Sequence, residues 1–205
     1  MHLNFYYIRH GETLFNVTGR AQGWCDSPLT AQGIEQAKEA GKRLKKIRID
    51  RAYSSSSQRA ADTAEIVLQG KDVEVKVLKG LREMYFGTLE GSDIDRADEM
   101  VRCWKKKDFR PYGGENKDDF IARILKTFSE IVKEAKDKEN ILIVSHNGYF
   151  YYMLEALFGS SLEKIEGSDP DFLHDLVPNG SIAEFIYEDG RYELTVLPSK
   201  KVLPE

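Results

Sequence analysis

The stretch Leu3-Asn4-Phe5-Tyr6-Tyr7-Ile8-Arg9-His10-Gly11-Glu12-Thr13 decides the fold class of this chain. Leu3 to Ile8 is a short apolar and aromatic run, rich in residues that favour β-strands, and it ends abruptly at a polar Arg9-His10-Gly11. The run predicts a buried strand whose carboxyl end meets a loop. Two polar side chains at such a place need a partner. Local sequence favours two interpretations about equally: an anion site, or a salt-bridged Arg beside a capping His.

Two further stretches have the same arrangement of a strand that ends in polar residues. Ile141-Leu142-Ile143-Val144 is a continuous apolar strand, and it leads into Ser145-His146-Asn147-Gly148 and then a predicted helix through Leu157. Ala52-Tyr53-Ser54 is a brief strand, and the serines after it can cap a helix that carries Arg59 in its first turn. Strands that alternate with helices predict a mainly parallel sheet with helices on both faces.

The remaining elements complete an α/β prediction. They are a helix from Thr30 to about Ile47, a half-exposed strand from Val73 to Leu78, a helix from Ile94 to Lys107, a helix from Asp118 to Lys136, and two strands, Ile182–Tyr187 and Tyr192–Leu197. The last two flank Glu188-Asp189-Gly190-Arg191, which predicts an antiparallel hairpin at the C-terminal end of the fold. We therefore expect a three-layer α/β/α sandwich on a mainly parallel sheet. The glycine-rich stretch at about 79–115 is interpreted as an insertion or lid within one domain of residues 1–205.

Composition excludes several classes of protein. Hydrophobic residues make up 41% of the 205 residues and charged residues 31%, which is typical of a globular chain. The net charge is -4, so the overall balance does not suggest a nucleic-acid partner. Cys25 and Cys103 form no CxxC pair and are expected to be reduced thiols. Because no run has the length of a signal peptide or a membrane span, we expect a cytoplasmic protein with no membrane partner.

The three strand ends point to one site. In open α/β sheets, ligands bind beyond the carboxyl ends of the strands. His10 and His146 fall there, and Arg59 lies at the start of a helix, where free N–H groups and a partial positive charge favour anions. A guanidinium fork also matches phosphate oxygens. Each stretch alone has a structural explanation, but their convergence on one edge favours a phosphate site.

At this point the sequence resembles a known family, the histidine phosphatase superfamily, which is also called phosphoglycerate mutase-like. The resemblance extends in order over nearly the whole chain. The residues that carry it are Arg9-His10-Gly11-Glu12-Thr13, Asn16, Gly23-Trp24, Asp26, Pro28-Leu29-Thr30, Gly33, Gln36-Ala37, Ser54-Ser55, Arg59-Ala60, Thr63-Ala64, Glu83 and Gly87, Glu90-Gly91 and Ser145-His146.

The resemblance implies a role for each residue of the site. His10 is the expected nucleophile, which forms a phosphohistidine through one ring nitrogen while the other is held as an N–H donor, with a backbone carbonyl as the expected acceptor. Arg9, Arg59 and a protonated His146 are expected to surround the non-bridging oxygens of the phosphate. The expected substrate-binding residues are Arg9, Asn16, Gln22, Gly23, Arg59 and His146.

The leaving group also needs a proton donor. The resemblance favours Glu83 as the general acid, which then acts as base toward the attacking water. That role requires a raised pKa, which burial beside Tyr85 and Phe86 would provide, whereas nearby arginines would oppose it. A surface glutamate in a glycine-rich loop is the structural alternative, and Glu12 and Glu115 are competing carboxylates.

The function predicted from these residues is a phosphatase that hydrolyses phosphate monoesters of small phosphorylated metabolites through a phosphohistidine. No metal is expected, because arginines supply the positive charge, and no cofactor. A homodimer is one assembly that the sequence allows. The alternative is a cofactor-dependent phosphoglycerate mutase, which would use 2,3-bisphosphoglycerate. The short Leu89-Glu90-Gly91 segment and His146-Asn147-Gly148-Tyr149 look more like the phosphatase branch. A third hypothesis, a phospho-ligand binding module without turnover, uses the same residues.

One basic run remains to be explained. Lys105-Lys106-Lys107 forms it together with Arg102 and Arg110. The structural interpretation is a solvated helix end, where lysines suit the helix dipole. The functional interpretation is recognition of a second acidic group on the substrate, such as a carboxylate or another phosphate.

Overall fold

Six strands form one mixed sheet in the order β3-β2-β4-β1-β5-β6. The computed structural model describes residues 1–94, 97–159 and 177–198. The strands are β1 (His2–Arg9), β2 (Arg51–Ser55), β3 (Val75–Leu78), β4 (Asn140–Ser145), β5 (Ile182–Glu188) and β6 (Arg191–Val196). The pairs β1–β4, β2–β4 and β2–β3 are parallel, whereas β1–β5 and β5–β6 are antiparallel. The predicted strands and the C-terminal hairpin are confirmed.

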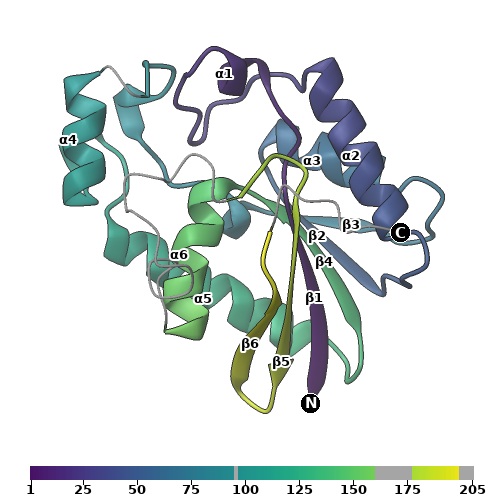
Figure 1. The fold of residues 1–205 in the computed structure, drawn as a ribbon. Coiled ribbons are helices and arrows are strands. Elements are labelled where there is room, and N and C mark those ends of the chain that lie inside the picture. The colour runs from purple at the N-terminus through teal and green to yellow at the C-terminus, as the bar shows by residue number, and fades with distance from the viewer. Residues whose placement is uncertain (95–96, 160–176, 199–205) are drawn as a thin grey trace.

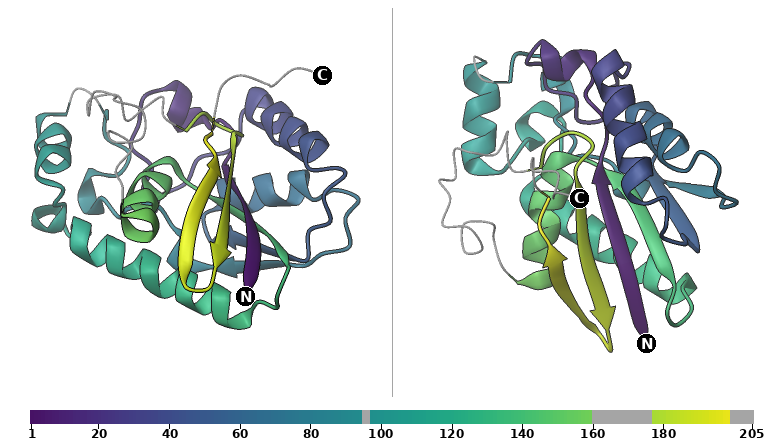
Figure 2. Two further views of the ribbon diagram at one scale, coloured as in Figure 1. Left: turned by 60° about the horizontal axis from the view of Figure 1, so that its bottom comes forward. Right: turned by 45° about the vertical axis from the view of Figure 1, so that its right-hand side comes forward.

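Six α-helices and three short 3-10 helices accompany the sheet. The α-helices are α1 (Leu14–Val17), α2 (Ala31–Arg43), α3 (Gln58–Val67), α4 (Asp98–Lys106), α5 (Lys117–Glu134) and α6 (Asn147–Phe158), and the 3-10 helices are η1 (Lys79–Leu81), η2 (Gly87–Leu89) and η3 (Arg110–Tyr112), all among the described residues. Helices α2 and α3 pack together on one side of the sheet, and α5 and α6 lie on the other (Figures 1 and 2). The predicted three-layer α/β/α arrangement is therefore confirmed. In the part of the chain that the structure describes, no helix combines the length and apolar character needed to cross a membrane.

The alternation of side chains along β1 explains the two hydrophobic layers. Phe5 and Tyr7 point into the larger core, which includes residues of α5 and α6, whereas Ile8 points into the second core with residues of α2 and α3. Phe5 stacks on Phe185 of β5, with ring centroids 4.8 Å apart. Each large side chain buried in this way contributes roughly 1.5–3 kcal/mol.

The register of the sheet places the ends of its central strands side by side. Ile8 of β1 pairs with Val144 of β4, which also pairs with Ser54 of β2. The loops that follow these three strands therefore start at the same edge of the sheet, at the top of Figure 1. Because β5 is antiparallel to β1, the segment that leads into β5 reaches this edge as well, and Ile182 pairs with Ile8.

Some predicted boundaries and elements differ from the structure. Helix α2 is capped by the Thr30 side chain as predicted, but it ends at Arg43 instead of Ile47, because Leu44 is buried and the chain turns there toward β2. Helix α4 begins at Asp98 and not at Ile94. Helix α1 was not predicted, since one turn of helix leaves no periodic pattern.

The first loop packs closely on α2. A Cβ atom added at Gly11 would lie 2.3 Å from the carbonyl oxygen of Gly33, and one added at Gly33 would lie 2.1 Å from that of Glu12. The two backbones thus approach more closely than any other residue type would allow. This contact fixes the loop that carries His10 against the start of α2.

Candidate active site

His10, Arg59 and His146 meet at the sheet edge described above. They come from the loop after β1, the first turn of α3 after β2, and the residue after β4. All three are buried, with relative exposures of 4%, 1% and 0%. The imidazole centroids of the two histidines are 5.3 Å apart, and the Arg59 guanidinium contacts both rings. The structure thus brings together side chains that are separated by up to 136 positions in the sequence.

The hydrogen bonds of His10 define its protonation state. Nδ1 lies 2.8 Å from the carbonyl oxygen of Gly11, to which it must donate. Nε2 accepts a hydrogen bond from Nε of Arg59 at 3.2 Å, and because a guanidinium has donors only, Nε2 carries a lone pair. His10 is therefore a neutral imidazole with an unprotonated Nε2. Burial, and then the charges of Arg59 and Arg9, lower its pKa well below 6.5.

His146 is also held in a neutral form by its hydrogen bonds. Nη2 of Arg59 donates to its Nδ1 at 3.1 Å, so its Nε2 carries the proton and donates to Oγ of Ser55 at 2.8 Å. Burial and the Arg59 charge lower the pKa of His146 well below 6.5. His146 is therefore neutral in this geometry, and its protonation beside a bound phosphate stays a prediction. The physical reason is that a cation next to a buried imidazole favours the neutral form.

Arg59 uses all of its donor groups within the protein. Besides the two imidazoles, it donates to the carbonyl oxygens of Cys25 and Gly23, both at 2.9 Å, and to Oδ1 of Asp26 at 2.6 Å. Asp26 also accepts the backbone N–H of Gln58 at 2.7 Å, at the start of α3. A carboxylate from a distant loop therefore both pairs with the guanidinium and caps the helix that presents it.

The segment before β5 closes the site on the side of Arg9. Nη1 of Arg9 donates to the carbonyl oxygen of Val177 at 2.5 Å, and the backbone N–H of Gly180 donates to that of Arg9 at 3.0 Å. Nδ2 of Asn179 donates to the carbonyl oxygen of His10 at 3.0 Å. Arg9 is buried, with 8% relative exposure, and lines the same cavity as His10. The predicted Arg9 and His10 pair is therefore fixed by a segment remote in sequence.

The predicted substrate-binding residues of the first loop also reach the cavity. Asn16, Gln22 and Gly23 all line it together with His10. Oδ1 of Asn16 accepts hydrogen bonds from the backbone and hydroxyl of Thr13, both at 3.0 Å. Gly23 has a positive φ of 52°, and a Cβ there would lie 2.3 Å from Oε1 of Glu90. The loop therefore requires glycine at this position.

Within the described part of the chain, Glu83 is the only carboxylate that lines the cavity. It is buried, with 8% relative exposure. Its Oε1 accepts the backbone N–H of Met84 and its Oε2 accepts that of Gly148, both at 2.9 Å. Burial raises the pKa of Glu83 above 4.5, although these hydrogen bonds and the charges of Arg59 and Arg9 oppose the shift. A raised pKa in the cavity is what a general acid needs.

The two competing carboxylates have structural partners instead. Glu12 accepts a hydrogen bond from Oγ1 of Thr30 at 2.7 Å, at the start of α2. Glu115 pairs with Arg123 of α5 through two hydrogen bonds, at 2.8 Å and 2.7 Å. Neither Glu12 nor Glu115 lines the cavity.

Arg123 also holds the backbone that carries Glu83. Its Nη1 donates to the carbonyl oxygens of Gly80 at 3.0 Å and Arg82 at 2.7 Å, and its Nη2 donates to that of Glu83 at 3.0 Å. The guanidinium lies over the ring of Phe120, 4.6 Å from the centroid. One side chain of α5 thereby fixes the loop that positions Glu83.

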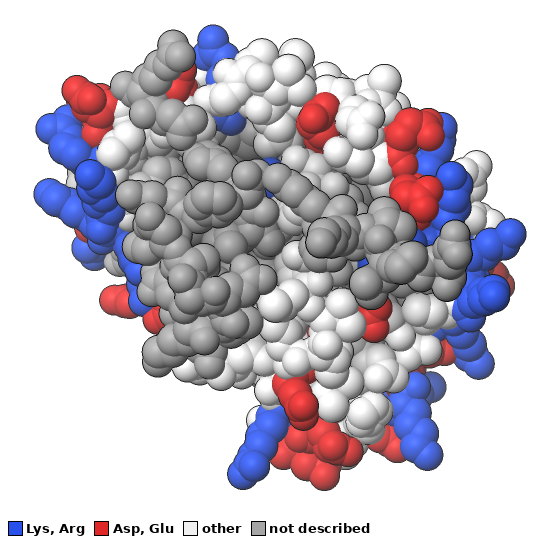
Figure 3. All heavy atoms as spheres, in the orientation of Figure 1, with Lys and Arg blue, Asp and Glu red and all other residues white. Residues whose placement is uncertain are grey.

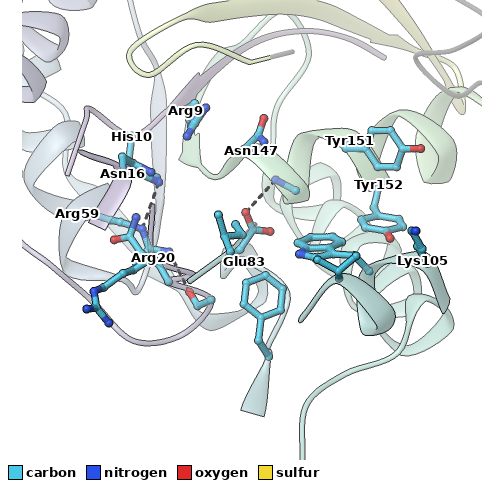
Figure 4. A pocket seen from close by; sticks show the side chains of 17 residues that line it. Arg9, His10, Asn16, Arg20, Arg59, Glu83, Lys105, Asn147, Tyr151 and Tyr152 are labelled. Atoms are coloured by element: carbon cyan, nitrogen blue, oxygen red, sulfur yellow. Dashed lines mark hydrogen bonds between the residues drawn. The ribbon is translucent and has the colours of Figure 1, made fainter. Parts of the chain in front are cut away.

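The cavity has a volume of about 240 Å³ and two chemically different ends (Figure 4). His10, Arg59 and Asn16 lie at one end, Tyr151, Tyr152 and Lys105 at the other, and Glu83 between them. Sequence reasoning missed several lining residues, namely Arg20, Ile94, Val101, Asn147, Gly148, Tyr151 and Tyr152. Their position next to the predicted motifs was a signal for Asn147 and Gly148, which follow His146. The others come from the first loop, the stretch around α4, and the second turn of α6.

The basic run of α4 is divided between the cavity and the surface. Lys105 lines the cavity, whereas Lys106 and Lys107 do not. Figure 3 shows Lys and Arg side chains at the edge of the molecule where α4 lies. Within the described part of the chain, no group of three or more His, Cys, Asp and Glu side chains is arranged to hold a metal ion.

Comparison with known proteins gives a consistent family. A family model described as the histidine phosphatase superfamily (branch 1) matches residues 5–199. An adenosylcobalamin/alpha-ribazole phosphatase of Salmonella typhimurium is 35% identical over 161 residues, which cover 76% of this chain and 79% of that protein. A 2,3-bisphosphoglycerate-dependent phosphoglycerate mutase 2 of Gloeobacter violaceus is 32% identical over 201 residues, which cover 93% of this chain and 89% of that protein.

A solved structure has the same fold over nearly the full length of both chains. YhfR of Bacillus stearothermophilus superposes with a TM-score of 0.81 at 30% sequence identity, and the match covers 95% of this chain and 96% of that chain.

Proposed function

Because this chain belongs to the histidine phosphatase superfamily and has phosphatases among its relatives, we propose that it hydrolyses small phosphate monoesters through a phosphohistidine on Nε2 of His10. The observation that carries the proposal is the state of His10. Its ring is neutral and buried, with Nδ1–H fixed on Gly11 and the lone pair of Nε2 beside a guanidinium. A nucleophile of this kind needs no base to activate it.

In the first step, the lone pair of Nε2 forms a bond to phosphorus as the ester P–O bond breaks. Arg59 and Arg9 bind the non-bridging oxygens, and Arg59 exchanges its contacts with the two imidazoles for contacts with these oxygens. The leaving alkoxide takes the proton of Glu83, whose raised pKa favours the acid form that this step requires.

In the second step, water attacks phosphorus and the N–P bond breaks. Glu83, now a carboxylate, accepts a proton from the water, and the bond electrons return to Nε2 of His10. Inorganic phosphate leaves, and both side chains regain their first state. The charge on the transferring group is neutralised by residues of this chain. Arg9, His10, Arg59 and His146, which we call the phosphate cage, therefore support a mechanism without a metal. That no metal takes part stays a prediction.

The alternative that the relatives keep open is a phosphoglycerate mutase. A mutase must keep a doubly phosphorylated, acidic intermediate bound while this intermediate changes its orientation in the site. In this cavity the end away from the phosphate cage is lined mainly by apolar and aromatic residues. That composition favours hydrolysis of other esters.

One experiment separates the candidates. The protein is incubated with p-nitrophenyl phosphate and, separately, with 3-phosphoglycerate and catalytic 2,3-bisphosphoglycerate. Free phosphate, isomerisation and acid-labile phosphohistidine are then measured. Hydrolysis predicts free phosphate from the ester, whereas isomerisation without free phosphate indicates a mutase. Phosphate binding with neither product nor label indicates a binding module.

The nucleophile has a matched control. His10→Ala is expected to abolish covalent labelling, while His2→Ala, which removes a partly exposed imidazole far from the cavity, is expected to leave it unchanged. A label that persists in His10→Ala and disappears in His146→Ala would move the nucleophile to the second histidine.

A further inference from the structure

Among the residues that the structure describes, six apolar and aromatic side chains line the part of the cavity that the chemistry above does not use. They are Phe86, Ile94, Val101, Trp104, Tyr151 and Tyr152, and we call them the apolar subsite. Phe86 and Tyr152 are buried, and the other four are half-buried. Apolar side chains left accessible in a concave site are typical of ligand recognition.

The sequence produces this subsite through helical spacing. Val101, Trp104 and Lys105 are three and four positions apart on α4, so they share one face of the helix and turn it toward the cavity. Met100 and Cys103 are buried on a different face of α4. Val101 on the cavity side is therefore additional to the residues that anchor the helix, whereas Trp104 also packs against the core.

Buried rings outside the cavity hold the subsite in place. Phe86 and Trp104 contact each other with centroids 5.3 Å apart, and both contact Phe109, at 4.8 Å and 5.4 Å. Phe109 is fully buried. Tyr151 and Tyr152 meet edge to face at 5.1 Å. Tilted and edge-to-face contacts of this kind stabilise ring orientation, so the subsite is pre-formed.

The position of the subsite relates it to the leaving group. The attacking and leaving atoms lie roughly in line in phosphoryl transfer. His10 lies at one end of the cavity, and Glu83, the proposed proton donor to the leaving oxygen, lies between His10 and the tyrosines (Figure 4). The substituent on the leaving oxygen therefore extends past Glu83 toward Tyr151 and Tyr152.

We infer that the apolar subsite binds the alcohol part of the substrate, and that this alcohol is apolar and about the size of one aromatic ring. The inference rests on the proposed function and adds the substrate class. The volume of about 240 Å³ is smaller than the roughly 300–1,000 Å³ of sites for drug-sized ligands. A polyol in this position would lose hydrogen bonds to water that apolar walls cannot replace.

A pair of substrates with equal chemistry tests the inference. Benzyl phosphate and ethyl phosphate both release primary alcohols of similar acidity, so a difference in kcat/KM reports the ring and not the leaving-group chemistry. Burial of the ring is expected to favour benzyl phosphate by about tenfold to a hundredfold. A ratio near one would overturn the inference.

Variants locate the preference in the subsite. Trp104→Ala is expected to reduce the ratio of kcat/KM for benzyl phosphate to kcat/KM for ethyl phosphate to a few-fold. Val101→Ser, a smaller change, is expected to reduce it several-fold. Arg102→Ala is the control on the same helix, because Arg102 is exposed and pairs with Glu99. A ratio that Trp104→Ala and Val101→Ser leave unchanged would refute the assignment.

Binding separates this inference from the proposed function. The affinities of benzylphosphonate and ethylphosphonate, which cannot be hydrolysed, are measured by calorimetry with the same variants. If neither ester is hydrolysed but benzylphosphonate binds more tightly and loses that advantage in Trp104→Ala, the subsite stands and the hydrolase proposal fails. Hydrolysis of both esters with equal phosphonate affinities supports the hydrolase and overturns the subsite.

Discussion

Nε of Arg59 donates a hydrogen bond to Nε2 of His10 at 3.2 Å. A permanently charged guanidinium therefore lies beside the nitrogen that carries the lone pair. The same guanidinium contacts Nδ1 of His146 through Nη2. A phosphate oxygen that binds Arg59 competes with both imidazoles for these donors. Anion binding therefore changes the surroundings of both histidines at once, and several measurable consequences follow from this contact and its neighbours.

Dianion binding is expected to bring a proton into the site. Once an anion takes the Arg59 donor away from Nδ1 of His146, the negative charge raises the pKa of this histidine, and Nδ1 becomes free to bind a proton. Calorimetry of tungstate binding near neutral pH, in buffers of different ionisation enthalpy, should show uptake of up to one proton. His146→Gln should abolish the uptake. Uptake that His146→Gln leaves intact would assign the proton to another group.

Glu83→Gln is expected to lower activity according to the leaving group. Ethyl phosphate needs a proton on its leaving oxygen and should lose about 10²–10⁴-fold in kcat/KM, which reports the first step, whereas p-nitrophenyl phosphate releases a stable anion and should lose much less. In the parent protein, kcat/KM for ethyl phosphate should fall as pH rises through the raised pKa of Glu83. The Glu83→Gln variant should lack this decrease of kcat/KM with rising pH. Glu12→Gln is the control, and equal losses on both esters would contradict the general-acid role.

Arg123 is expected to act as a positioning residue for Glu83. Arg123→Lys removes the fork that donates to the carbonyl oxygens of Gly80, Arg82 and Glu83, so the carboxyl group should shift relative to the leaving oxygen. Such a displacement is expected to lower kcat/KM by about 10²-fold. The loss should again be large for ethyl phosphate and small for p-nitrophenyl phosphate. If both esters lose activity equally, or only Tm falls, Arg123 has a purely structural role.

The two buried imidazoles are expected to make stability depend on pH. The pKa values of His10 and His146 are lowered well below 6.5 in the folded protein. Between those values and 6.5 the unfolded chain binds protons that the folded protein does not. The free energy of unfolding should therefore decrease as pH falls below about 6.5, by at most roughly 1.4 kcal/mol per pH unit for each histidine. Urea unfolding across this range measures the slope.

Glutamine variants show which histidines cause the pH dependence of the free energy of unfolding. His10→Gln and His146→Gln should each reduce the slope, and His2→Gln controls for loss of an imidazole at the surface. A slope that survives the removal of both buried rings would have to come from other groups.

Lys105 is expected to recognise a second acidic group, if the substrate has one. Lys105→Ala should raise KM for esters that carry a carboxylate, such as 4-carboxybenzyl phosphate, and leave KM for benzyl phosphate unchanged. Lys106→Ala is the matched control, because Lys106 does not line the cavity. Equal changes for the two esters would reject this role and favour the interpretation of a solvated helix end.

The sequence predicts the strands, the layers and the phosphate cage because each has a local signal. Apolar runs that end in Arg9-His10 and in Ser145-His146 indicate both the strand and the edge where it ends. The protonation state of His146 could not be predicted, because it depends on the direction in which Arg59 points across the sheet.

Contacts between distant segments account for the other omissions. Asn179 reaches His10 because β5 runs antiparallel to β1, and no short-range pattern records that pairing. Ile94 and Val101 of the apolar subsite were missed because they look like core residues in a helical pattern. Their partners, Tyr151 and Tyr152, lie on another helix.

The contacts of Arg9 and His10 with Val177, Asn179 and Gly180 also have a consequence during protein synthesis. The nucleophile directly follows β1, but the groups that fix its backbone are synthesised only after β1, β2 and β4. A nascent chain that has completed β1, β2 and β4 still lacks this clamp. These contacts of Arg9 and His10 can therefore form only when the segment that leads into β5 has been synthesised and has paired with β1.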